Sequence, residues 1–203
     1  MKKIDYSKYK TDKVACHGYM PHYERIFADL RKKPIKLLEI GVMEGHCLVM
    51  WRDFFAKGSE IQGLDFHCTP LDREALKEIK VHDVDVLEWD TDEMYDIIID
   101  DASHDAHEQI ETIMKLWKNI KSGGIYVIED VPYPDKVRDG LKDFISQPKV
   151  QFEEVEGDNP RLPDDRLFVF SRKRKGITSL TFWQKIVNMF LPSKGKKTNE
   201  DKH

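Results

Sequence analysis

Two short polar clusters, each directly after an apolar run, hold the side chains best suited to chemistry. Asp100, Asp101 and His104 follow one run, and Glu129 and Asp130 follow another. Carboxylates that lie close together raise one another's pKa unless a cation compensates their charge. Oxygen ligands of this kind suit Mg²⁺ or another hard divalent ion, and a histidine beside them has a pKa suited to a general base. The pattern favours a metal site with an adjacent base.

A simpler interpretation of the same residues stays open. Acidic residues favour the first turn of a helix, and Asp is a good N-cap. Either Asp105 or Ser103 could cap the helix expected to begin near Ala106. His104 could likewise be a helix-start histidine satisfied by backbone groups.

Apolar runs rich in Ile, Val and Leu predict the strands that position these clusters. The runs are 35–40, 60–66, 79–84, 95–100 and 124–129, and helices are expected at 21–32, 46–55, 70–77 and 106–120. Strands apolar on both faces that alternate with helices are typical of a parallel sheet covered on both sides. We expect the turn at 122–124 to end the last helix, and 151–156 and 166–171 to form an antiparallel edge pair. The predicted fold class is α/β, a doubly wound, mostly parallel Rossmann-like sheet with a C-terminal amphipathic helix.

Ligands of such sheets lie beyond the carboxyl ends of the strands, near the point where strand order reverses. Gly41 and Gly45 follow the first strand and would let the backbone turn sharply beside a ligand. Met43 stands where a dinucleotide fingerprint needs a third glycine, which disfavours NAD. Asp65, at the end of the second strand, is placed to accept hydrogen bonds from a ribose diol. An ordinary strand-to-helix turn and a solvated acid are the alternatives for these positions.

Charge divides the chain unevenly. The 203 residues include 33 basic and 37 acidic ones, for a net charge of −4, yet residues 172–203 carry +7 and residues 1–171 carry −11. We therefore expect two parts, a domain over 1–171 and a basic amphipathic helix with a polar tail over 172–203. The apolar stripe of 177–191 could lie on an anionic membrane surface, or pack on the body or a second subunit. An acidic body without an aromatic-basic groove argues against nucleic acid as a partner.

Composition narrows the class of protein and its expected cellular compartment. Hydrophobic residues make up 40% and charged residues 34% of the chain, which excludes collagen, an integral membrane protein and a fully disordered chain. Three cysteines without a zinc-binding spacing, and an N-terminus without an apolar signal segment, favour the cytoplasm. Peripheral contact with a membrane stays an open alternative.

Several motifs together resemble a known family, the class I S-adenosylmethionine-dependent methyltransferases. The resemblance is to their metal-dependent branch of macrolide-sugar O-methyltransferases and cephalosporin hydroxylase-like proteins. It covers about residues 11–130. The matching stretches are Thr11-Asp12-Lys13 with His17 and Tyr19, LLEIGVMEG at 37–45, Asp65, IIIDDASH at 97–104 and GGIYVIED at 123–130. The last two are the specific part.

The resemblance implies methyl transfer from S-adenosylmethionine to a hydroxyl of a sugar or similar polyol. It implies Asp101, Glu129 and Asp130 as metal ligands and His104 as the general base. For the cofactor it implies Glu39, Gly41, Gly45, Asp65 and Asp83, with Asp85 as an alternative to Asp83 at the adenine. Glu108 stands where the family often has histidine, so the neighbouring His107 inherits no role. The alternative is a non-catalytic or metal-independent protein on the same fold, acting as a binding partner.

Overall fold

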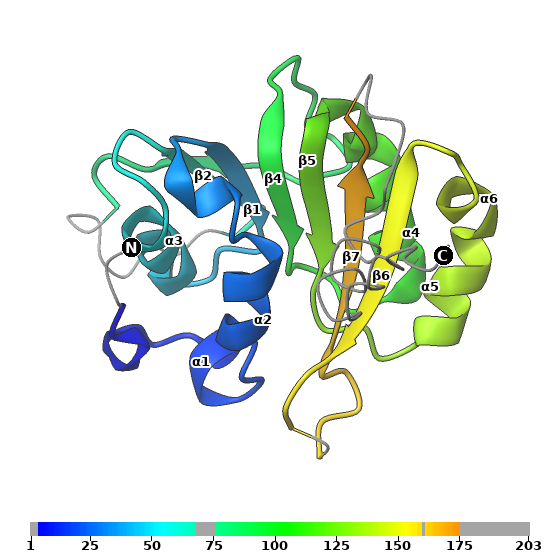
Figure 1. Cartoon of the computed structure of the whole chain (residues 1–203), viewed down its shortest axis with the longest axis horizontal. Helices are drawn as coiled ribbons and strands as arrows, with labels where there is room; N and C mark the ends of the chain where they lie inside the picture. Colours follow the sequence, from blue (N-terminus) through cyan, green and yellow to red (C-terminus); the bar gives the residue numbers. More distant parts are fainter. Residues whose placement is uncertain (1–3, 68–75, 160, 175–203) are drawn as a thin grey trace, which may run out of the picture.

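The computed structural model describes residues 4–67, 76–159 and 161–174, which form one seven-stranded sheet and its covering helices (Figure 1). The strand order is β3-β2-β1-β4-β5-β7-β6. The strands are β1 (Lys36–Ile40), β2 (Glu60–Asp65), β3 (Lys80–Asp83), β4 (Tyr95–Asp100), β5 (Ile120–Ile128), β6 (Val150–Glu156) and β7 (Arg166–Arg172). β1 to β5 pair in parallel, whereas β7 is antiparallel to both β5 and β6.

Helices cover both faces of the sheet. They are η1 (Tyr6–Lys8), α1 (Asp12–Ala15), α2 (Met20–Ile26), η2 (Leu30–Lys32), α3 (His46–Phe54), α4 (Ala106–Leu116), η3 (Trp117–Asn119), α5 (Pro134–Gly140) and α6 (Lys142–Ile145). Residues of α2 and α3 pack on one face, with Leu37, Ile97 and Val127 of the sheet. Residues of α4, α5 and α6 pack on the other, with Leu38 and Ile98. Alternate residues of each strand therefore enter separate hydrophobic cores, as expected for a doubly wound sheet.

The predicted fold class is confirmed for the described residues, including the antiparallel edge pair of β6 and β7. One boundary is wrong. The turn expected at 122–124 lies inside β5, which begins at Ile120. A Cβ on Gly124 would lie 2.9 Å from the carbonyl oxygen of Asp96, and the register of β5 against β4 shifts between Tyr95 and Ile97. Gly124 therefore permits a close approach of two strands at an irregularity, and it does not end a helix.

Three α-helices of the described residues were not predicted: α1, α5 and α6. α5 and α6 follow β5, and Pro134 occupies the first turn of α5. Proline at that position is compatible with a helix because its missing N–H would have no intrahelical partner. The helices expected at 70–77 and 177–191 fall wholly or mostly outside the described residues, and so does most of the basic C-terminal part.

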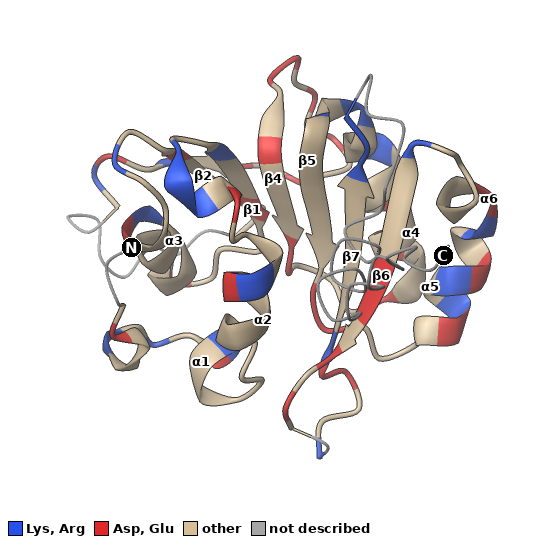
Figure 2. Ribbon diagram, in the orientation of Figure 1, with Lys and Arg blue, Asp and Glu red and all other residues tan. Residues whose placement is uncertain are grey.

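The charges of the described residues are unevenly placed. Figure 2 shows acidic residues gathered near the lower ends of β4, β5 and β6. For β4 and β5 these are the carboxyl ends, at which parallel α/β sheets bind ligands. Among the described helices, none is long and apolar enough to cross a membrane.

Candidate active site

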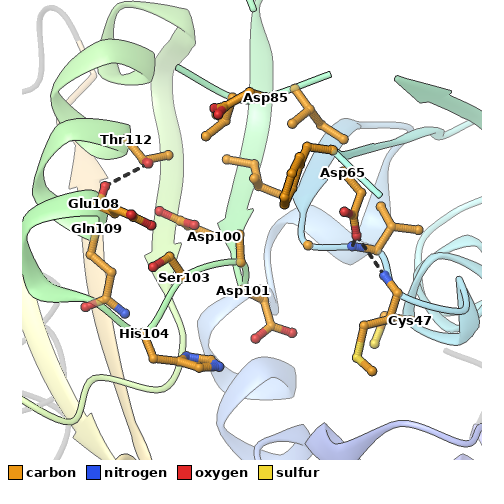
Figure 3. A pocket seen from close by; sticks show the side chains of 18 of the residues that line it. Cys47, Asp65, Asp85, Asp100, Asp101, Ser103, His104, Glu108, Gln109 and Thr112 are labelled. Atoms are coloured by element: carbon orange, nitrogen blue, oxygen red, sulfur yellow. Dashed lines mark hydrogen bonds between the residues drawn. The ribbon is translucent and has the colours of Figure 1, made fainter. Parts of the chain in front are cut away.

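A cavity of about 620 Å³ lies at the carboxyl ends of β1, β2 and β4 (Figure 3). The strand order reverses here, because β2 and β4 flank β1 on opposite sides. The walls come from the turn after β1, the end of β2, the loop after β3, the loop between β4 and α4, and the segment before α1. Residues that line it include Thr11, Asp12, Gly41, Met43, Cys47, Asp65, Phe66, Asp85, Leu87, Asp101, His104 and Gln109. The cavity therefore occupies the position that the fold predicts for a ligand.

Gly41 and Asp65 shape one part of this cavity. The backbone of Gly41 has φ +87°, and a Cβ there would overlap the carbonyl group of Asp101, with the carbonyl carbon 2.6 Å away. Asp65 Oδ2 accepts hydrogen bonds from the N–H groups of Val42 at 2.7 Å and Met43 at 3.0 Å. Although partial burial works to raise the pKa of Asp65, these N–H groups and that of His67 lower it overall. Asp65 is thus held as an acceptor beside the turn after β1.

His104 and Asp101 occupy the other part of the cavity. In Figure 3 the His104 ring and the Asp101 carboxylate point into the same space, in the lower part of the view. His104 is exposed, and no described residue forms a hydrogen bond with its ring. Of the two expected caps, Asp105 and Ser103, the structure has Asp105, which accepts a hydrogen bond from the N–H of His107 at 2.8 Å. The imidazole is available to a ligand in the cavity.

A buried lysine lies beneath Asp101. Thr11 caps α1, and Lys13 in that helix extends its ammonium group into a cluster of acids. Lys13 Nζ forms ion pairs with Asp101, with Glu129 Oε2 at 3.1 Å and with Glu39 Oε1 at 3.4 Å. The Lys13 and Glu39 side chains are fully buried. The Lys13 contacts were not predicted; the only signal was the Thr11-Asp12-Lys13 motif, which by itself assigns the lysine no role.

Tyrosines from the N-terminal segment hold the acids that follow β5. Tyr23 donates its hydroxyl hydrogen to Glu129 Oε1 at 2.5 Å, and Tyr19 donates to Asp130 Oδ1 at 2.7 Å. Gln109 of α4 donates to the carbonyl oxygens of Glu129 and Asp130 at 3.3 and 3.2 Å. Asp130 has φ +51°, a conformation that costs a non-glycine residue energy and persists only where its surroundings impose it. The segment after β5 is therefore fixed from both faces of the sheet.

Burial disfavours the ionised forms of these acids, and their partners oppose this effect only in part. Burial raises the pKa of Glu39 to about 7, of Asp130 to about 6 and of Glu129 well above its usual value. Lys13 lowers the pKa of Glu39 and Glu129, and the Tyr19 hydroxyl lowers that of Asp130, but these effects do not offset burial. One ammonium faces Glu39, Asp101 and Glu129, so a further cation would stabilise the cluster.

The donor set suits a hard divalent ion, although the predicted ligands are divided. Two groups of described residues have ligand atoms that all lie within 4.8 Å of one another: Glu39 with Asp101 and Glu129, and Asp12 with His17 and Asp130. The predicted set of Asp101, Glu129 and Asp130 draws on both groups, and only Asp101 lines the cavity. Carboxylate oxygens are the ligands that Mg²⁺ prefers. The chemistry of the site therefore fits the ion. Lys13 contacts two of the expected metal ligands, Asp101 and Glu129.

Only some of the residues predicted to bind the cofactor line the cavity. Gly41 and Asp65 line the cavity. Gly45 caps α3 with φ +82°, and Glu39 is buried against Trp51, whose Nε1 donates to it at 3.1 Å. Asp83 ends β3 outside the cavity wall, whereas Asp85 lines it. Of the two acids left open for the adenine, the structure brings Asp85 to the cavity.

The sheet order and the cavity at its switch point define the class I methyltransferase fold. A solved structure with this fold is the MycE methyltransferase of mycinamycin biosynthesis, in complex with Mg, SAH and mycinamycin VI. It superposes with a TM-score of 0.65 at 24% sequence identity, over 88% of this chain and 56% of that one. This likeness establishes the fold.

Sequence comparison finds similarity to sugar O-methyltransferases. The chain is 34% identical over 143 residues to mycinamicin VI 2''-O-methyltransferase of Micromonospora griseorubida, covering 62% of this chain and 34% of that protein. It is 33% identical over 143 residues to demethylmacrocin O-methyltransferase of Streptomyces fradiae, covering 62% and 35%. No protein-family model matches the chain. The chain spans about a third of the length of these curated relatives. The predicted resemblance to sugar O-methyltransferases is thereby confirmed.

Proposed function

We propose that this protein transfers a methyl group from S-adenosylmethionine to a hydroxyl of a sugar or similar polyol, assisted by a divalent ion. The observation that carries the proposal is a single cavity at the switch point, with Gly41 and Asp65 in one part and His104 and Asp101 in the other. The similarity to enzymes named as sugar O-methyltransferases supports the same reaction.

The first part of the cavity suits the methyl donor. Asp65 is an anionic acceptor at the end of β2, suited to the two ribose hydroxyls. The absence of a side chain at Gly41 lets the backbone approach the ligand closely. Phe66 and Leu87 offer exposed apolar surface in the same cavity, and Asp85 adds an acceptor for an exocyclic amine. Glu39 and Gly45 do not line the cavity and support it indirectly. Glu39 pairs with Lys13, and Gly45 caps α3.

The second part of the cavity suits the acceptor, and Asp101 in its wall connects it to the buried acids of the proposed metal site. Asp101, Glu129 and Asp130 would hold the divalent ion. When bound, such an ion supplies a positive charge that lowers the pKa of a nearby hydroxyl. His104 accepts the proton that the hydroxyl loses, and Asp101 and His104 together orient the acceptor in the cavity. The oxygen gains the methyl group and the donor sulfur keeps the bonding electron pair, so charge is balanced.

The proposal is tested by methyl transfer from labelled S-adenosylmethionine to a set of soluble sugars, nucleotide sugars and glycan precursors. We expect release of S-adenosylhomocysteine with Mg²⁺ and none with EDTA. Binding of S-adenosylhomocysteine without Mg²⁺-dependent transfer to any of them would contradict the proposal.

One observation favours a second candidate, methyl transfer without a metal. The Lys13 ammonium already lies against Asp101 and Glu129, so these acids have a cationic partner without a metal. Transfer that persists unchanged in EDTA would favour this candidate over the first.

A further inference from the structure

Lys13 is the most unusual charged residue in the described part of the chain. Its side chain has 0% exposure, and lysine is almost never buried unless its charge is paired. Its partners come from distant elements: Asp101, 88 residues away, follows β4; Glu129 follows β5; and Glu39 lies in β1. The short helix α1 therefore carries one ammonium group into the base of the proposed metal site.

The ammonium occupies space that the proposed ligands would offer to a metal. Glu129 has both carboxylate oxygens engaged, Oε1 by the Tyr23 hydroxyl and Oε2 by Lys13. Asp101 offers Oδ2 to Lys13. A divalent ion on these carboxylates would lie close to a positive charge in a buried environment, where like charges repel strongly.

The backbone at Asp101 and the side chain of Glu129 are held by contacts besides those with Lys13. The Asp101 N–H donates to the carbonyl oxygen of Ile40 at 2.9 Å, and the carbonyl of Asp101 packs against Gly41. Tyr23 and Gln109 hold the side chain and the carbonyl of Glu129. Removing the ammonium would thus free carboxylate oxygens of Asp101 and Glu129 while the backbone that carries Asp101 and the Tyr23 contact of Glu129 remain.

We propose that Lys13 is an internal cation that competes with the divalent metal for Asp101 and Glu129. It stabilises the acids in the metal-free protein and weakens metal binding, so that the ion is held loosely and exchanges. This inference rests on the proposed function for the identity of the metal ligands. Lys13 acts only through Asp101 and Glu129, because its side chain is fully buried and does not line the cavity.

The test is calorimetric titration of the full chain with Mn²⁺ alone, without methyl donor or acceptor. We expect Lys13→Met to bind Mn²⁺ at least about tenfold more tightly than the wild type, because a repelling charge is removed. Lys36→Met is the matched control. Lys36 also pairs with two acids, Glu60 and Glu93, yet belongs to the opposite end of the sheet, so we expect its dissociation constant to stay within about twofold of wild type.

An unchanged or weaker affinity of Lys13→Met would overturn the competition. Asp101→Asn separates this outcome from failure of the proposed function. If the wild type binds Mn²⁺ and Asp101→Asn does not, the metal site stands and only the role of Lys13 is refuted. If neither wild type nor Lys13→Met binds Mn²⁺, the metal assignment fails and the competition fails with it.

A second measurement applies if Lys13→Met does not fold. Ammonium signals of ¹⁵N-labelled wild-type protein are followed by NMR during a Mg²⁺ titration, and Lys13→Arg identifies the Lys13 signal by its loss. We expect the Lys13 signal to move in step with metal binding, since the ion displaces its contacts with Asp101 and Glu129. A Lys13 signal that stays fixed at saturating Mg²⁺ would refute the inference.

Discussion

Replacing Gly41 with alanine should damage the fold and the site together, by an amount that the structure lets us work out. A Cβ there would lie 2.6 Å from the carbonyl carbon of Asp101 and 2.9 Å from Cα of Ala102. Carbon atoms that are not bonded prefer a separation of about 3.5–4.0 Å, so the backbone would have to move by about 1 Å. We assign about 1 kcal/mol to the left-handed φ and about 2 kcal/mol to this overlap. The expected loss in the free energy of unfolding is about 3 kcal/mol.

Gly58 provides the matched control for this substitution. Its φ is +90°, close to the +87° of Gly41, but a Cβ there would first meet Pro34 at an ordinary 3.7 Å. Gly58→Ala should therefore cost only the conformational part, about 1 kcal/mol. The difference of about 2 kcal/mol between the two variants measures the contact with the loop that carries Asp101.

Urea unfolding of both variants, followed by tryptophan fluorescence, measures these costs. Titration with S-adenosylhomocysteine at a temperature where both are folded measures the site. We expect Gly41→Ala to bind the ligand more weakly and Gly58→Ala to bind it as the wild type does. If the two variants differ by less than about 0.5 kcal/mol in unfolding free energy, the packing argument is refuted, because that is within the effect of an ordinary surface substitution.

Three further predictions address the chemistry and the charges. His104→Ala should reduce methyl transfer by at least about 10²-fold, the usual contribution of a general base, with unchanged affinity for S-adenosylhomocysteine by calorimetry; near-normal turnover would exclude the base role. Asp101→Asn should raise the Mg²⁺ concentration needed for half-maximal transfer by at least about tenfold, measured at fixed methyl donor; an unchanged Mg²⁺ dependence would remove Asp101 from the ligands. Lys36 holds the pKa of Glu93 at about 2, well below its usual 4.5, so this pair stabilises the fold above about pH 4.5 and loses that effect as pH falls toward 2. Lys36→Met should lower the free energy of unfolding by about 1 kcal/mol or less at pH 7, because the pair is partly solvated. In urea titrations, the stability of this variant should fall less steeply below pH 4.5 than that of the wild type. Parallel pH dependences of the variant and the wild type would contradict this.

The strands and the acids at their ends could be predicted because both signals are local. The run YDIII before Asp100 is apolar on both faces, and β4 spans the predicted residues 95–100. Asp101 follows that strand directly, so predicting the strand also predicted the position of the acid. The exception was β5, where Gly123 and Gly124 favour a turn by local chemistry but lie within the strand, with Gly124 at a close contact with β4.

The role of Lys13 could not be predicted, because it depends on contacts between distant residues. A lysine in a polar N-terminal segment is normally exposed. Only the folded chain brings α1 beneath β1, β4 and β5, where three acids compensate the cost of burying the ammonium. The same applies to Tyr23, whose hydroxyl contacts Glu129 across 106 residues of sequence.

The measurement that tests the account most directly is methyl transfer by the full chain from labelled S-adenosylmethionine to a pooled set of sugars and nucleotide sugars. It is run with Mg²⁺, with EDTA and with the His104→Ala variant. The account predicts labelled sugar and S-adenosylhomocysteine only for the wild type with Mg²⁺. Equal product in EDTA, or equal product from His104→Ala, would contradict it.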